Sequence, residues 1–205
     1  DILRSGVDVI TSGNHIWNKK DMVAVLNEER YILRPYNYPR ATPGRGFTAV
    51  NCDGYRLGVL NLQGRTFMQA IDCPFKSADE AIDVYGSDVD AIVVDFHAEA
   101  TSEKQALGMY LDGRVSAVVG THTHVQTADE RILTNGTAYI TDLGMCGPVN
   151  SVIGMSYETS IAKFLSGTPT RFEVAKGQVM LCYVVIDIDH STGKARSIER
   201  IMDVG

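Results

Sequence analysis

The sequence predicts an α/β sandwich, and three observations lead to this fold class. Short runs rich in Val, Ile and Ala alternate with helical periodicity through the first part of the chain. The last part holds several runs that are typical of antiparallel strands. Neither a GxGxxG nor a Walker A sequence is present, so nucleotide binding by a glycine loop is not expected. Strand–helix units followed by a series of strands indicate a sandwich rather than a Rossmann domain.

The composition is typical of a globular protein with one core. The 205 residues are 44% apolar and 21% charged, and the formal net charge is −6. This charge argues against a non-specific nucleic-acid or membrane surface, and no apolar run reaches the ~18 residues that a membrane span needs. The scattered cysteines favour free thiols in a reducing cytosol, so we expect a cytoplasmic protein. They are Cys52, Cys73, Cys146 and Cys182.

Four elements are expected before the middle of the chain. Residues 7–11 are predicted as a strand, and Asn18 as the cap of a helix that reaches Leu26. Residues 34–46, rich in Pro, Gly and aromatics, indicate an ordered loop. An Asp-Gly pair between residues 47–51 and 55–62 predicts a hairpin.

Later elements follow the same local signals. Pro74 is expected to open a helix, and Ser102, with Gln105 three residues later, to form a capping box for a helix that ends at Leu111. One further helix is predicted over residues 157–165. The remaining predicted strands cover residues 89–95, 115–119, 137–141, 171–174, 179–188 and 195–202.

Four of the five histidines follow a predicted strand. They occur in Gly13-Asn14-His15, Asp95-Phe96-His97 and Gly120-Thr121-His122-Thr123-His124. The carboxyl ends of strands are where open α/β sheets bind ligands, and imidazole is a ligand for Zn, Fe, Mn and Ni. One such histidine alone would be better explained by a backbone partner. Four of them predict a shared metal site, whereas His190 is expected to be a solvated turn residue.

The site implied by these motifs lacks carboxylate ligands. Two divalent cations held close together need carboxylates to offset their mutual repulsion, but Asn14 and the histidines are neutral. The opening segment, Asp1 to Gly6, resembles the last turn and C-cap glycine of a helix. We therefore expect the sequence to be a fragment whose acidic ligands precede Asp1.

Longer runs around the motifs resemble the YmdB-type family of calcineurin-like binuclear metallophosphoesterases. The resemblance extends to the closing strands and covers essentially the whole chain. It implies a single metallophosphoesterase domain over residues 1–205, with a four-layer α/β/β/α sandwich that is missing its first strands. The runs are Ile10 to Trp17, Asn61 to Phe67, Asp95 to Lys104, Val119 to Asp129 and Thr141 to Met145.

The resemblance also implies an activity and a set of roles. The family opens 2′,3′-cyclic nucleotides to 3′-nucleotides with a hydroxide between two divalent ions, iron or manganese. By the matched motifs, Asn14, His97 and His122 would hold the second metal and His124 the first. His15 would be the catalytic proton donor. The family's Gly-Asp and Gly-Glu-Asn motifs, which supply the other ligands, are not found here, so the fragment as given is expected to bind metal poorly.

Alternatives stay open at this point. The chain could prefer phosphomonoesters or linear diesters, or it could be a metal-bound regulatory module with little turnover. A small-molecule nucleotide is the expected partner, without stable nucleic-acid or membrane binding, and a homo-oligomer is neither required nor excluded. For several nearby side chains a solvated or structural role is an alternative of at least equal weight, and for Trp17 and Tyr36 core packing is the favoured one. They are Asp95, Glu99, Asp129 and Asp142 as imidazole partners, Arg65 and Arg114 for phosphate, and Trp17 and Tyr36 for a base.

Overall fold

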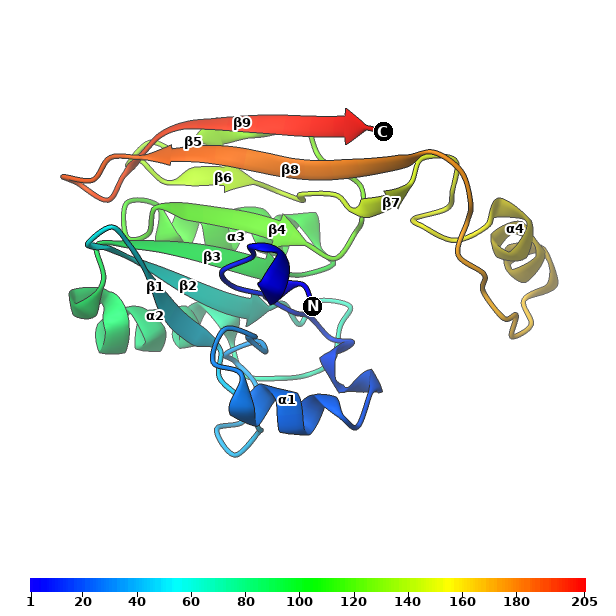
Figure 1. The fold of residues 1–205 in the computed structure, drawn as a ribbon, viewed down its shortest axis with the longest axis horizontal. Helices are drawn as coiled ribbons and strands as arrows, with labels where there is room; N and C mark the ends of the chain where they lie inside the picture. The colour runs from blue at the N-terminus through cyan, green and yellow to red at the C-terminus, as the bar shows by residue number, and fades with distance from the viewer.

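All 205 residues are described by a computed structural model with two β-sheets and four α-helices (Figure 1). The strands are β1 (Phe47–Cys52), β2 (Tyr55–Gln63), β3 (Ala91–His97), β4 (Ala117–Thr121), β5 (Arg131–Ile132), β6 (Ala138–Ile140), β7 (Cys146–Pro148), β8 (Val179–Ile188) and β9 (Ala195–Val204). The helices are α1 (Met22–Glu28), α2 (Pro74–Tyr85), α3 (Thr101–Leu111) and α4 (Tyr157–Ser166). Short 3₁₀ turns cover Leu3–Ser5, Ile16–Asn18 and Gly86–Asp88.

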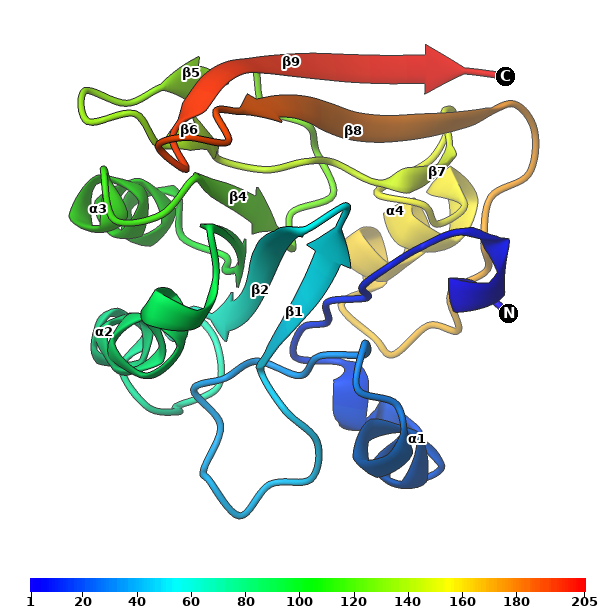
Figure 2. The same cartoon turned by 60° about the vertical axis from the view of Figure 1, so that its left-hand side comes forward.

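The larger sheet has the strand order β1-β2-β3-β4-β6-β5, and the smaller one has the order β7-β8-β9. Strands β2, β3, β4 and β6 run parallel, while β1 and β5 are antiparallel edge strands. Figure 2 shows α2 and α3 on one side of the larger sheet, with β8 and β9 on the other. This mixed α/β fold with a parallel sheet confirms the predicted fold class.

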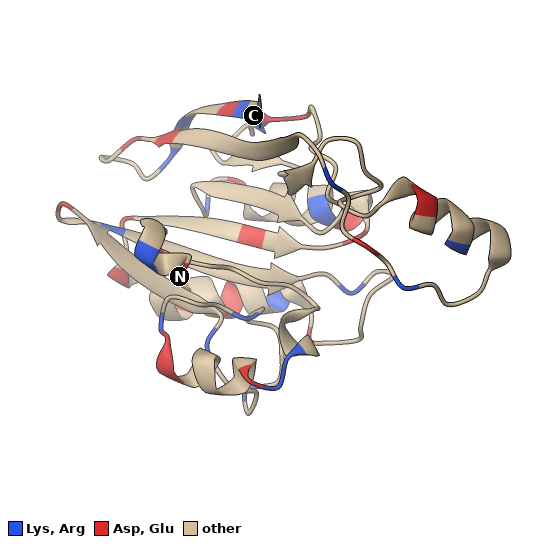
Figure 3. Ribbon diagram, turned by 45° about the vertical axis from the view of Figure 1, so that its right-hand side comes forward, with Lys and Arg blue, Asp and Glu red and all other residues tan.

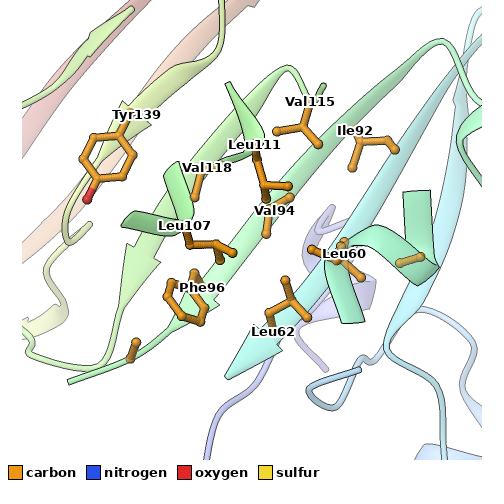
Figure 4. Packing of buried hydrophobic residues seen from close by; sticks show 13 residues of the cluster. Leu60, Leu62, Ile92, Val94, Phe96, Leu107, Leu111, Val115, Val118 and Tyr139 are labelled. Atoms are coloured by element: carbon orange, nitrogen blue, oxygen red, sulfur yellow. The ribbon is translucent and has the colours of Figure 1, made fainter. Parts of the chain in front are cut away.

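The two faces of the larger sheet are both buried, but against different partners. One face packs on α2 and α3, and its core includes Leu62, Phe96 and Leu107 (Figure 4). On the opposite face, Ala117 packs with Ile186 of the smaller sheet. Because side chains alternate along a strand, Asp95 and His97 lie on the face opposite Phe96, toward the smaller sheet.

Elements with strong local signals form where they were predicted. The hairpin of β1 and β2 closes on Asp53 and Gly54, whose φ angles are 52° and 90°. Two positive φ angles are those of a type I′ turn, which matches the twist of the flanking strands. Pro74 is the first residue of α2, where its missing N–H costs no helical hydrogen bond.

Two predicted strands were wrong because each finds a partner at only one point. In residues 7–11, the pairing is a single bridge between Ile10 and Ile32. Residues 171–174 likewise form one bridge, between Val174 and Met155. A strand without a continuous ladder on either side leaves most of its backbone groups to other partners.

Two predicted helix caps were also wrong. Helix α1 begins at Met22, and Asn18 instead donates from Nδ2 to His15 Nδ1 at 3.1 Å. Helix α3 has Ala100 at its N-cap, without a side-chain cap. The expected box fails at Ser102 because the helix already starts at Thr101. The two-residue strand β5 and the three-residue strand β7 were not predicted.

The smaller sheet has one face without protein cover. Val179, Leu181, Tyr183 and Val185 point outward from β8 and are exposed, while the alternate residues face the larger sheet. Figure 3 shows β8 to be almost free of charged residues along its length. No helix in the structure is both long and apolar enough to span a membrane.

Candidate active site

The sheet brings the predicted histidine motifs to one edge. His97 is the last residue of β3 and pairs in register with Thr121, the last residue of β4. His122 and His124 follow directly. The Gly13-Asn14-His15 segment reaches the same edge because Ser12 donates from its backbone N–H to Asn61 Oδ1 of β2 at 3.1 Å.

Three side chains meet at this edge. His97 Nε2 lies 2.9 Å from Asn14 Oδ1. The same nitrogen lies 3.1 Å from His122 Nδ1, and the two imidazole rings meet edge to face with centroids 4.7 Å apart. Gly13 makes this approach possible, because a Cβ atom there would lie 2.1 Å from His97 Nε2.

The far nitrogen of His97 is held through a hydroxyl group. His97 Nδ1 lies 3.0 Å from Thr121 Oγ1, which donates to Asp95 Oδ1 at 2.8 Å. With the hydroxyl proton directed to Asp95, Thr121 accepts the proton of Nδ1, and Nε2 keeps its lone pair. The buried carboxylate of Asp95 therefore sets the tautomer of His97 through Thr121.

The other two histidines are held in a similar way. His122 Nε2 lies 3.0 Å from Glu99 Oε2, and His124 Nδ1 donates to the carbonyl oxygen of Ile153 at 3.1 Å. Each contact leaves the second ring nitrogen, His122 Nδ1 or His124 Nε2, as the one with a lone pair. Metal-binding histidines are oriented by partners of these kinds.

Burial keeps the central imidazoles neutral. The pKa of His97 is lowered to about 3, chiefly by burial and next by repulsion between the charged forms of His97 and His122. Burial also lowers the pKa of His122, although Glu99 opposes this shift. Burial raises the pKa of Asp95 to about 6, against hydrogen bonds from Thr11 and Thr121. Neutral imidazoles offer lone pairs without having to lose a proton first.

The loop of His122 and His124 has an unusual backbone. The φ angles of these residues are 107° and 68°, in a region that L-residues seldom adopt. Lys104 Nζ donates to Thr121 O at 2.7 Å, and Asp142 Oδ2 accepts from Thr123 N at 3.0 Å. The loop is thus fixed on both sides of His122.

The remaining predicted residues lie next to this cluster. His15 is exposed and follows Asn14, close enough that its charge lowers the pKa of His97. His124 is exposed on the other side of His122, and its charge lowers the pKa of His122. Contacts therefore join Asn14, His97 and His122, while His15 and His124 flank the three.

The donor atoms of Asn14, His97 and His122 have a spacing that suits a divalent ion. No three side chains drawn from His, Cys, Asp and Glu form a metal-binding group, but the amide oxygen of Asn14 adds a third donor to two imidazoles. Ligands about 2.1 Å from a metal and at right angles to each other are about 3.0 Å apart. The contacts of 2.9 and 3.1 Å fit this spacing, and nitrogen with amide oxygen suits several transition metals.

Other proposed site residues have different roles. Asp129 accepts hydrogen bonds from Thr141 and Thr127, and Asp142 pairs with Lys104, so neither contacts a histidine. Arg114 pairs with Asp79 at 2.7 Å, before the start of β4 and away from this edge. Trp17 packs on Tyr38 and Tyr36 on Tyr85, with ring centroids 5.7 and 6.4 Å apart.

Sequence reasoning missed Thr121, Lys104 and Ile153. Thr121 had a local signal, because it lies between a strand and a histidine pair. Lys104 had none, since a helical lysine is normally exposed. Ile153 acts through its backbone carbonyl, which no side-chain pattern reports.

Known proteins match the chain over nearly its whole length. It is 55% identical over 201 residues to the 2′,3′-cyclic-nucleotide 2′-phosphodiesterase of Bacillus subtilis, a match that covers 98% of this chain and 76% of that protein. A crystal structure of a hypothetical protein from Thermus thermophilus superimposes with a TM-score of 0.93 at 41% identity, covering 99% of this chain and 79% of that one.

A more distant structure shares the fold. The NAD nucleotidase of Haemophilus influenzae superimposes with a TM-score of 0.57 at 12% identity, covering 99% of this chain and 41% of that one. The family model described as YmdB-like protein matches residues 1–201. With this match and the Bacillus subtilis relative, the chain belongs to the YmdB-like protein family.

Proposed function

We propose that this chain is a metal-dependent phosphodiesterase that hydrolyses 2′,3′-cyclic nucleotides to 3′-nucleotides. The observation that carries the proposal is the convergence of Asn14 Oδ1, His97 Nε2 and His122 Nδ1 at the edge of the sheet. The name of the Bacillus subtilis relative supports the substrate class. The proposal treats residues 1–205 as one metallophosphoesterase domain that acts on a small-molecule nucleotide in the cytoplasm.

In this proposal, Asn14, His97 and His122 hold one divalent ion and His124 contributes to a second. Iron and manganese both suit such nitrogen and oxygen donors. When bound, two such ions supply a water of lowered pKa and positive charge for the phosphate oxygens. The chain's contribution is to keep the donor nitrogens unprotonated and fixed in direction, through Thr121, Glu99 and the carbonyl group of Ile153.

His15 is proposed as the proton donor to the leaving ribose oxygen. The 2′ oxygen leaves as an alkoxide, which needs a proton as its bond to phosphorus breaks. Asn18 Nδ2 lies 3.1 Å from His15 Nδ1, which leaves Nε2 of this exposed ring, beside Asn14, as the nitrogen that would give up the proton of an imidazolium.

The substrate class is tested with the intact protein loaded with Mn²⁺. It is assayed on 2′,3′-cyclic AMP and on p-nitrophenyl phosphate, and the nucleotide product is identified by chromatography. We expect higher kcat/KM on the cyclic diester, with 3′-AMP as the product. A preference for p-nitrophenyl phosphate would favour a phosphomonoesterase, and activity that a chelator leaves unchanged would exclude metal dependence.

The role of His15 is tested with His15→Ala. This variant should lose turnover by about 100-fold or more, on the order expected for general acid catalysis, while its metal content stays unchanged. His190→Ala is the matched control, because His190 is exposed in the turn between β8 and β9, where it stacks on Tyr55 with centroids 4.4 Å apart. Loss of metal from His15→Ala would make His15 a ligand instead.

A further inference from the structure

Phe67 is an aromatic residue held out into solvent. Its side chain is 90% exposed, more than any other large apolar side chain in the chain. Its φ angle is 61°, in the left-handed region that is unfavourable for a residue with a Cβ atom. No packing within the chain compensates for this conformation.

The loop that carries Phe67 starts beside the metal-ligand candidates. It follows β2, whose last residue, Gln63, pairs in register with His97. Gly64 donates from its backbone N–H to His97 O at 2.9 Å. Phe67 is four residues after Gln63, so its Cα lies at most about 14 Å from that strand end.

The loop is fixed at its start and tied to the His15 segment at its end. The carboxylate of Glu103 accepts from Arg65 N at 3.1 Å and from Thr66 N at 3.2 Å. Past Phe67, Gln69 Oε1 accepts from Tyr38 OH at 3.4 Å, and Tyr38 packs on Trp17, two residues after His15. The loop therefore lies between the end of β3 and the segment that supplies the proposed proton donor.

We propose that Phe67 stacks on the nucleobase of the substrate and that loop 64–68 selects nucleosides over base-free phosphodiesters. The inference rests on the proposed function and adds a base subsite to it. A base offers an aromatic face whatever its identity, so one exposed ring gives preference for a nucleoside without strong preference among bases. A fixed loop lowers the entropy lost when the ring is covered.

The other aromatic candidates are less suited to this role. Trp17 packs edge-on against Tyr38, and Tyr36 packs edge-on against Tyr85, so their rings already have partners.

Arg65 is exposed two residues before Phe67, and its guanidinium is available to an anionic ligand.

The test compares Phe67→Ala with wild type on two five-membered cyclic diesters. These are 2′,3′-cyclic AMP and glycerol 1,2-cyclic phosphate, which has no base. KM for cyclic AMP should rise roughly 10-fold to 100-fold, the effect of losing one stacked base, with kcat within about 2-fold. Both constants for the glycerol diester should stay within about 2-fold, and Phe67→Tyr should restore the low KM for cyclic AMP.

Phe164→Ala is the matched control, since Phe164 is 81% exposed on α4. It should leave both substrates unchanged. Equal KM values for cyclic AMP in wild type and Phe67→Ala would overturn the base subsite and leave the proposed function intact.

Absence of cyclic AMP turnover in wild type would overturn the proposed function itself. Binding of 3′-AMP, measured by calorimetry, then tests Phe67 separately. A drop of about 10-fold or more in the affinity of Phe67→Ala would support the subsite, whereas equal affinities, or no binding to either protein, would overturn it.

Discussion

Lys104 Nζ lies 2.7 Å from Asp142 Oδ2, and the two side chains are 1% and 0% exposed. The same ammonium group donates to Thr121 O, while the same carboxylate accepts from Thr123 N. The ion pair therefore connects helix α3 to both sides of His122, which has a φ angle of 107°. A buried pair of this kind adds little net stability, but it fixes the direction of the groups around it.

Lys104→Met should lower the free energy of unfolding by about 3–5 kcal/mol, because it leaves the buried charge of Asp142 unpaired. The double variant Lys104→Met/Asp142→Asn removes both charges and should recover much of this loss. Its Mn²⁺ affinity should nevertheless stay below that of wild type, because Thr121 O has lost its donor. Thermal melting measures the change in stability, and titration with Mn²⁺ measures the change in metal affinity. Wild-type metal affinity in the double variant would show that Lys104 and Asp142 do not position the His122 loop.

Gly13→Ala should displace His97. The added Cβ would lie 2.1 Å from His97 Nε2, closer than any van der Waals contact allows. We expect metal affinity and turnover to fall at least about 10-fold, as for loss of a partner that orients a ligand. Gly86→Ala is the control, because a Cβ there would meet nothing closer than Ile82 Cγ2 at 3.5 Å.

Thr121→Val should weaken metal binding about 10-fold to 100-fold, because the link from Asp95 to His97 is lost while the shape is kept. Thr121→Ser keeps the hydroxyl group and should stay near wild type. Calorimetric titration with Mn²⁺ measures both. Equal affinities for the valine and serine variants would show that the hydroxyl does not orient His97.

Asp129→Asn should destabilise the fold in a pH-dependent way. Burial raises the pKa of Asp129, but hydrogen bonds from Thr141 and Thr127 outweigh it, so the net pKa is lowered. A carboxylate whose pKa is lower in the folded protein than in the unfolded chain stabilises the fold at pH values above its unfolded pKa of about 3.9. This stabilisation is lost as the pH falls through the lower pKa of the folded protein. We expect the free energy of unfolding of Asp129→Asn to be about 1–3 kcal/mol below that of wild type at pH 7. This difference should shrink below pH 4, and urea unfolding at several pH values measures it. A deficit that is constant with pH would point to lost packing instead.

The parts of the fold that were predicted correctly depend on neighbours in sequence. The Asp53-Gly54 turn and the Pro74 helix start need only a few adjacent residues, and both formed as expected. Residues 7–11 failed because a strand also needs a partner along its length, and only Ile10 found one. The Ser102 cap failed because Ala100 occupies the N-cap position of α3.

The sequence by itself determined the fold class, the family and the positions of His97, His122 and His124 at strand ends, because periodicity and strand-end motifs are properties of neighbouring residues. The strand expected before His15 did not form. The tertiary structure alone decided which atoms meet. It brought Asn14 Oδ1 within 2.9 Å of His97 Nε2, 83 positions apart in the chain, and it assigned Thr121, Glu99 and the carbonyl of Ile153 as partners of the imidazoles. The sequence offered Glu99 as one of several candidate partners, but the atom that each partner contacts depends on the packing of distant segments and on backbone groups, which the order of side chains does not report.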